Sequence, residues 1–164
     1  MTTHRPHIVV LGGGYAGVLA ANHLLQNPAV DVTLVNARAE FVERIRLHQL
    51  AIGTDDAVAD YDDLLGERVR LVVDRATAID TAGRRVELAS GTGLTYDQLI
   101  YAVGSTSGAA PEFAYPLSEL EDAQRLAARL QDVPTSAPIV VVGGGLTGIE
   151  AASEFASGPA GRPV

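Results

Sequence analysis

The chain contains no cysteine and no lysine. Without cysteine, disulfide bonds, thiolate metal sites and a dithiol redox centre are excluded within these residues. Because all 12 basic side chains are arginines, the chain can supply neither a P-loop lysine for phosphates nor a lysine Schiff base. Acidic side chains outnumber basic ones, 20 to 12, and the resulting net charge of -8 argues against a nucleic-acid partner.

Long apolar runs are also missing, since no stretch reaches the roughly 18 residues that a membrane-spanning helix needs. The basic start followed by the apolar run Ile8–Ala21 resembles a secretory signal, which is the alternative to a cytoplasmic chain. Three consecutive glycines inside this run would break the helix of such a signal. The 4 histidines show no metal-ligand spacing, so solvated or packed histidines and no metal site are expected.

A GxGxxG pattern occurs twice in the chain, each time between an apolar strand-like run and a helical pattern. The first copy is Gly12, Gly14 and Gly17, and the second is Gly143, Gly145 and Gly148. In this context the three glycines permit a tight turn, the approach of a pyrophosphate and close packing of helix on strand. The helix that begins at Tyr15 and Ala16 then offers unpaired N–H groups to the phosphates. The alternative is a glycine turn that only packs a helix on a strand.

The remaining pattern predicts an α/β fold with a parallel sheet. Buried strands are expected at Ile8–Leu11, Val32–Val35, Val69–Val73 and Leu99–Val103. Helices are expected at Tyr15–Leu25, at Phe41–Ile52 with Gly53 as C-cap, and from a capping box at Ser118–Glu121 to about Gln131. Turn signals between Ala76 and Thr95 predict an antiparallel flap, and Ile139 is expected to begin a second βα unit.

Asn36 stands at the end of the second predicted strand, nineteen residues after Gly17. Dinucleotide sites usually place an acidic residue at this point, about 20 residues after the glycines, to bind the adenosine ribose. An amide can accept from one hydroxyl and donate to another, without the strength of a charge-assisted bond. Asn36 is therefore a candidate ribose ligand, and the alternative is an asparagine that only ends the strand.

Taken together, the two fingerprints, the segment TYDQLIYAVGS at Thr95–Ser105 and the linking YPLSELEDAQRLAARL resemble FAD-dependent pyridine nucleotide oxidoreductases, the flavoproteins with two dinucleotide domains. The resemblance implies a Rossmann-like parallel sheet that binds FAD through the first fingerprint, and a second Rossmann-like domain that binds NAD(P)H. It divides the chain into the N-terminal part of an FAD domain at 1–110, a connecting helix and linker at 111–137, and the truncated start of an NAD(P)H domain at 138–164.

The same resemblance implies further site residues. In RIRLHQ, Arg44 matches an arginine near the FAD phosphates, and Gln49 stands where ferredoxin and rubredoxin reductases have a lysine near the flavin. Ala76 matches a backbone clamp on the adenine, while Ala102, Val103 and Gly104 match a turn over the FAD phosphates. Glu150 matches a glutamate near the meeting point of nicotinamide and flavin. The alternatives are solvated arginines at 44 and 46, and a helix-surface glutamate at 150.

By resemblance the chain is most similar to type II NADH:quinone oxidoreductases and the related apoptosis-inducing-factor-like quinone reductases. This implies a hydride from NAD(P)H, passed through FAD to a quinone or another external acceptor. The chain then corresponds to an N-terminal fragment, inactive by itself, from a protein that is cytoplasmic or peripherally attached to the inner face of the membrane through its C-terminal part. The alternatives are a nucleotide-binding fragment or sensor without turnover, a ferredoxin-reductase-type flavoprotein and a flavin monooxygenase.

Overall fold

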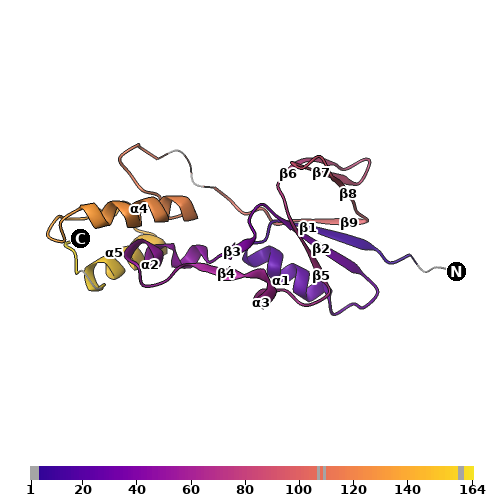
Figure 1. Ribbon diagram of the computed structural model, residues 1–164, viewed down its shortest axis with the longest axis horizontal. Helices are drawn as coiled ribbons and strands as arrows, with labels where there is room; N and C mark the ends of the chain where they lie inside the picture. The colour runs from indigo at the N-terminus through magenta and orange to yellow at the C-terminus, as the bar shows by residue number, and fades with distance from the viewer. Residues whose placement is uncertain (1–3, 107, 109, 159–160) are drawn as a thin grey trace. The chain divides into compact units, whose positions relative to one another are not determined.

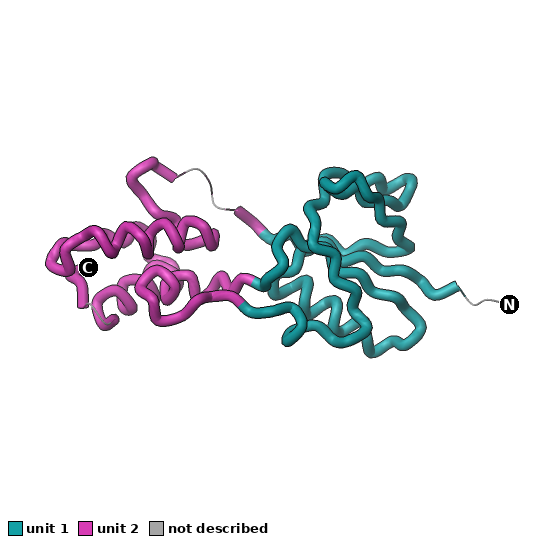
Figure 2. The backbone as a smooth tube through the Cα atoms, in the orientation of Figure 1, with its two compact units in different colours: residues 1–41, 59–104 teal, residues 42–58, 105–164 magenta. Residues whose placement is uncertain are grey.

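The computed structural model describes residues 4–106, 108, 110–158 and 161–164. The chain forms two compact units, which are coloured separately in Figure 2. We call Met1–Phe41 with Ala59–Gly104 the sheet unit, and Val42–Val58 with Ser105–Val164 the helical unit. Each unit is described by itself.

The sheet unit is built on a 4-stranded sheet with the order β5-β2-β1-β9 (Figure 1). Every neighbouring pair in it is parallel, which confirms the predicted parallel sheet, and β1 is an interior strand. Helix α1 connects the first two strands, as expected of a βαβ unit. The bounds are β1 His7–Leu11, α1 Tyr15–Leu24, β2 Asp31–Asn36, β5 Val69–Val73 and β9 Gln98–Tyr101.

Both faces of this sheet are covered, which explains why its first two strands are each buried at four consecutive positions. On one face, Ile8, Val10 and Leu34 form a buried cluster with side chains of α1. On the other face, Val9 and Leu11 pack against the antiparallel flap through side chains such as Val86 and Leu88. The flap has the order β6-β7-β8 and occupies the predicted segment, with β6 Ala76–Asp80, β7 Arg85–Leu88 and β8 Gly93–Thr95.

Three short elements that the sequence did not predict complete the region between β2 and β5. Strands β3 (Glu40–Val42) and β4 (Val58–Asp60) form a two-stranded sheet, and α3 follows at Tyr61–Leu64. The predicted helix at Phe41–Ile52 is therefore wrong in its first half. Phe41 is instead a buried strand residue that packs edge-on against two tyrosine rings.

The helical unit contains the 3-10 turn η1 (Arg44–Arg46) and helices α2 (Leu47–Ile52), α4 (Leu120–Asp132) and α5 (Leu146–Ser157). Helix α2 is the second half of the predicted helix, and Gly53 ends it in the left-handed conformation with φ 79°, as expected of a glycine C-cap. Buried side chains of α2 and α5, chiefly Ala51, Ala151 and Phe155, form one of its two apolar clusters.

The predicted capping box at the start of α4 is also wrong. Helix α4 has Glu119 as its N-cap residue, with no hydrogen bond from a capping side chain. The carboxylate of Glu119 forms an ion pair with Arg44, with Oε1 and Nη2 3.2 Å apart. Ser118 Oγ is buried and has no hydrogen-bond partner within the described part of the chain.

Of the second predicted βα unit, the structure has the helix, α5, but not the strand. Residues 138–142 are not in a regular strand, but the Ile139 N–H donates to the Pro163 carbonyl oxygen at 2.8 Å. Among the described residues, no helix has the length and apolar character needed to cross a membrane.

Candidate functional site

The first glycine turn lies at the carboxyl edge of the parallel sheet. The Gly12 N–H donates to Val35 O at the end of β2 (2.9 Å), and the Ala102 N–H after β9 donates to Leu11 O (2.7 Å). Gly12 has φ +99°, and a Cβ at this position would lie 2.3 Å from Ala102 O. Gly12 is therefore required by the backbone conformation and by the close approach of the segment after β9.

Gly14 and Gly17 have different reasons to be glycine. A Cβ on Gly17 would lie 1.8 Å from Gly12 O, so the contact between helix and turn excludes any side chain there. A Cβ on Gly14 would meet nothing within 4 Å, and its φ of -75° suits any residue. Packing within the chain thus explains Gly12 and Gly17 but not Gly14. The open space at Gly14 is where the predicted pyrophosphate would approach the backbone.

Helix α1 begins at this turn with features that suit an anion. Gly14 is its N-cap residue, no capping side chain bonds the helix, and the first turn has no acidic residue. Tyr15 and Ala16 are both exposed. The partial positive charge of a helix N-terminus favours a negative group at such a place.

The backbone of Gly13 is held at its N–H and at its carbonyl oxygen by two side chains. Its N–H donates to Asn36 Oδ1 at 3.0 Å, and its carbonyl oxygen accepts from the Tyr61 hydroxyl at 2.7 Å. Asn36 Nδ2 in turn donates to the Arg38 carbonyl at 3.1 Å. The predicted ribose ligand Asn36 therefore already braces the glycine turn, with one lone pair of Oδ1 and one hydrogen of Nδ2 left for a ligand.

Tyr61 is the site residue that sequence reasoning missed. It is buried at 3% exposure, and desolvation raises its pKa to about 12, so the hydroxyl remains a proton donor at neutral pH. No spacing in the sequence singles it out, because it is the first residue of a short helix 48 positions from its partner.

Four other predicted FAD residues, Ala76 and the segment 102–104, lie in the same unit. Ala76 begins β6 and packs, partly buried, against the cluster around Val9 and Leu11. Val103 is about half exposed, and Gly104 has the positive φ of 73° that favours glycine. The segment after β9 thus reaches the glycine turn at Ala102 and Val103, and its role as a turn over the FAD phosphates stays a prediction.

Arg44, in the helical unit, has three intramolecular partners. Nε donates to Ser118 O at 2.8 Å, and Nη1 donates to Ser105 O at 2.7 Å. Nη2 pairs with Glu119 Oε1 at 3.2 Å. The guanidinium is therefore not a solvated surface charge, and its role toward FAD phosphates stays a prediction.

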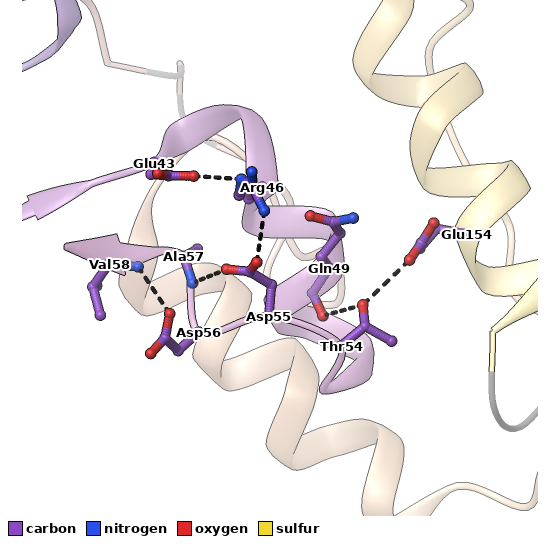
Figure 3. Close-up of polar contacts among 9 residues, drawn as sticks. All are labelled: Glu43, Arg46, Gln49, Thr54, Asp55, Asp56, Ala57, Val58 and Glu154. Carbon is purple, nitrogen blue, oxygen red and sulfur yellow. Dashed lines mark hydrogen bonds and ion pairs between the residues drawn. The ribbon is translucent and has the colours of Figure 1, made fainter.

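The segment around Gln49 is drawn in Figure 3. Arg46 pairs with Glu43 and, at 2.8 Å, with Asp55, so it too has partners within the unit. The backbone N–H of Ala57, together with Arg46, holds the pKa of Asp55 below its ordinary value. The Thr54 hydroxyl lies 3.4 Å from the backbone oxygen of Gln49 and 3.2 Å from Glu154 (Figure 3).

The second glycine turn repeats the geometry of the first. Gly143 has φ +131°, and a Cβ on Gly148 would lie 1.9 Å from Gly143 O. Gly145 is the N-cap residue of α5, and a Cβ on it would meet nothing within 4 Å. Glu150 is exposed in the first turns of α5. In the ranges that the structure describes, no group of three metal-ligating side chains occurs.

The family is decided by a match over almost the whole chain. Residues 6–160 match the family model described as pyridine nucleotide-disulphide oxidoreductase. The chain belongs to this family. It has no cysteine, so a disulfide centre of the kind in the family's name is absent from these residues.

Similar proteins include several curated NADH dehydrogenases and relatives. A NADH dehydrogenase-like protein of Mycobacterium tuberculosis is 35% identical over 90% of this chain and 42% of its own length. Ferroptosis suppressor protein 1 of Taeniopygia guttata is 32% identical over 96% of the chain and 42% of its own length. A type II NADH:quinone oxidoreductase of Staphylococcus haemolyticus is 28% identical over 94% and 44%. The chain thus spans less than half the length of these relatives.

Solved structures share the fold. NDH2 of Plasmodium falciparum, solved with NADH, superposes with a TM-score of 0.73 at 23% identity, over 93% of this chain and 37% of its own. NADH:rubredoxin oxidoreductase of Clostridium acetobutylicum gives a TM-score of 0.71 at 25% identity, over 96% and 43%. These superpositions agree with the α/β fold described above.

Proposed function

We propose that this chain carries the adenine and pyrophosphate half of an FAD site, in an oxidoreductase that takes hydride from NAD(P)H and passes electrons to a quinone. The observation that supports the FAD half most strongly is Gly14. It is exposed at the N-terminus of α1, and no contact among the described residues requires it to lack a side chain. A phosphate that approaches the backbone does require it.

Each candidate FAD residue of the sheet unit has a defined part in this proposal. The turn at Gly12–Gly14 and the first N–H groups of α1, at Tyr15 and Ala16, bind the pyrophosphate. Asn36 offers its remaining hydrogen-bonding capacity to the ribose, and the backbone at Ala76 flanks the adenine. The segment at 102–104 closes over the phosphates from the end of β9. When bound, FAD supplies the ring that accepts the hydride and releases electrons to the acceptor.

The helical unit contributes the start of the NAD(P)H site. Gly143, Gly145 and Gly148 repeat the ligand-facing geometry of the first turn, with the same open position at the helix N-cap. Glu150 follows in the same helix and is assigned to the nicotinamide side. Arg44 and Gln49 are assigned to the FAD side as positioning groups, Arg44 through its bonds to the backbone at 105 and 118.

A quinone is favoured as the acceptor because several relatives are named for it. The relatives from Staphylococcus are type II NADH:quinone oxidoreductases. A rubredoxin reductase and a putidaredoxin reductase also share the fold, so a small redox protein is the second candidate.

The proposed activity is tested with the product of the complete reading frame that contains these residues, purified with FAD. It should be yellow and oxidise NADH or NADPH when a soluble quinone is added. If the product retains FAD but transfers electrons only to rubredoxin, the acceptor is a small redox protein and not a quinone. A product that binds neither FAD nor ADP would contradict the proposal.

The 164-residue chain alone is the matched control. It should bind ADP about as well as FAD, because it contacts only the ADP half that the two ligands share. The flavin half of FAD adds no contacts with this chain, so it adds no affinity. It should not oxidise NADH. Tight FAD binding with turnover by this chain alone would show that the site is not a half-site.

A further inference from the structure

Three consecutive glycines form the first turn, and such a backbone has the greatest freedom to lose on folding. A turn that must present its N–H groups in one direction therefore needs an external restraint. In the sheet unit this restraint acts on the middle glycine, Gly13, which is buried. The pattern GxGxxG leaves this position undefined, so the fingerprint itself gives Gly13 no role.

Both hydrogen-bonding groups of Gly13 are occupied by side chains from other elements. Asn36, the last residue of β2, accepts from its N–H at 3.0 Å. Tyr61, the first residue of α3, donates to its carbonyl oxygen at 2.7 Å. A Cβ on Gly13 would lie 2.0 Å from Tyr61 Oη and 2.9 Å from Asn36 Cγ. The two side chains thus enclose the Gly13 peptide so closely that only glycine fits.

The Tyr61 hydroxyl is itself held in place by aromatic packing. Its ring meets Phe41 edge-on, with centroids 6.2 Å apart. Phe41 meets Tyr15 edge-on at 5.0 Å, and Tyr15 is the residue that directly follows the glycine turn. The three rings therefore connect α3, β3 and the N-terminus of α1.

The second glycine turn serves as an internal comparison. Gly144 stands at the position equivalent to Gly13, yet a Cβ on it would meet nothing within 4 Å. The restraint is therefore a property of the first turn and not of every GGG sequence in this chain.

We propose that Tyr61 is a positioning residue for dinucleotide binding, acting through Gly13 to fix the turn that receives the pyrophosphate. The proposal rests on the proposed FAD half-site. Without the Tyr61 hydroxyl, the peptide between Gly13 and Gly14 can rotate. Only a fraction of molecules then presents the binding-competent turn. Affinity then falls by that fraction, although no group that touches the ligand has changed.

The test compares Tyr61→Phe with wild type in the 164-residue chain, using ADP and adenosine as probes in NMR titrations. Tyr61→Phe keeps the ring and loses only the hydroxyl. We expect it to weaken ADP binding by about three- to tenfold, the size of one net hydrogen bond, and to leave adenosine binding unchanged. Tyr96→Phe is the matched control, because its hydroxyl lies at 3.5 Å from the Asp80 carbonyl in the flap segment.

Hydrogen exchange supplies a readout that is independent of the ligand. In Tyr61→Phe the Gly13 amide should exchange faster than in wild type, while the amides of β1 keep their protection. Unchanged ADP affinity in Tyr61→Phe would overturn the positioning role alone. Equal losses for ADP and adenosine would also overturn it, by showing a general structural defect.

Failure of the wild-type chain to bind ADP at millimolar concentration would instead contradict the proposed half-site, and with it the positioning role of Tyr61. A second pair of variants guards against a folding defect in Tyr61→Phe. Gly13→Ala should weaken ADP binding because its methyl group displaces the tyrosine hydroxyl. Gly144→Ala, its equivalent in the second turn, should leave ADP binding at the first turn unchanged, as followed by the amide signals of Gly12–Gly17. Equal ADP affinities in these two variants would contradict the proposal.

Discussion

At the scale of single residues, the glycines of one motif separate into those that the fold needs and those that a ligand needs. Gly12 and Gly17 approach other backbone atoms so closely that a methyl group cannot be accommodated. Gly14 is free of such contacts. The sequence motif treats the three alike, and only the surroundings of each Cβ position distinguish them.

Substitution should reveal this difference as a difference in stability. Gly17→Ala is expected to lower the free energy of unfolding by at least about 1–3 kcal/mol, the usual cost of overpacking. Gly14→Ala is expected to leave it unchanged or slightly raised, because alanine restricts the unfolded chain. Urea denaturation followed by circular dichroism measures both variants against wild type. Equal destabilisation by the two variants would refute the separation.

Tyr61 should make the chain sensitive to alkali. Its folded pKa of about 12 lies above the ordinary 10.0, so the stability it contributes is complete below pH 10.0 and is lost as pH rises through the folded value. The shift corresponds to about 2–3 kcal/mol at most. Tyr61→Phe should therefore show a flatter loss of stability over this range than wild type or Tyr96→Phe. Parallel alkaline stability curves for all three proteins would count against a protonated, buried Tyr61.

At the scale of elements, the sequence predicted those whose residues are buried along most of their length or are bounded by clear turn residues. Strands β1 and β2 are each buried at four consecutive positions because both faces of the sheet are covered, and β5 is apolar at every position except Arg70. The flap was predictable from its turn residues. These elements needed no knowledge of distant contacts.

The elements that sequence missed depend on tertiary contacts. Phe41 and Ile45 have the spacing of a helix face, yet Phe41 packs in the sheet unit while Ile45 is largely exposed. Ser118 and Glu121 have the spacing of a capping box, but Arg44 engages both Ser118 O and Glu119 from 74 and 75 positions away. Such long-range contacts override a local pattern.

A carboxylate joins the amino ends of β1 and β9. Asp97 Oδ2 accepts from the His7 N–H at 2.7 Å and lies 3.1 Å from His4 Nε2. The pKa of Asp97 is lowered, chiefly by the His7 N–H and further by His4. The stability that it contributes is thus present above the ordinary aspartate pKa and is lost as pH falls through the lower folded value.

Asp97→Asn should accordingly be less stable than wild type at neutral pH and should converge with it in acid. The amide can still accept from the His7 N–H, so the difference reports the charge. Thermal unfolding between neutral and acidic pH measures this effect, with the exposed Asp62→Asn as control. A constant difference between Asp97→Asn and wild type at every pH would exclude the charge as its cause.

At the scale of the whole molecule, the helical unit exposes an unusual amount of apolar surface. Val140 and Val142 are 83% and 93% exposed, and Leu146 and Ile149 are also exposed, whereas Ile139 and Val141 pack inward. A segment that is apolar on both sides is typical of a strand covered on both faces. This pattern agrees with the proposal that 138–164 belongs to a larger nucleotide-binding domain.

The isolated chain should therefore bind hydrophobic dyes and self-associate through this surface. The double variant Val140→Thr and Val142→Thr is expected to reduce dye fluorescence and association without lowering the melting temperature. Val141→Thr, which changes the inward side, should lower the melting temperature instead. Unaltered dye binding in the double variant would show that the dye binds another apolar surface.

The central claim is that the first glycine turn receives the pyrophosphate of a dinucleotide. The most direct measurement is an ADP titration of the 164-residue chain followed by the backbone amide signals, with Gly14→Val as the matched variant. We predict saturable shifts centred on Gly12–Gly17 and Asn36 in wild type, and their loss in a folded Gly14→Val, because the added side chain fills the space beside the backbone. Saturable shifts that spare Gly12–Gly17, or ADP binding of equal strength at these residues in Gly14→Val, would contradict the account.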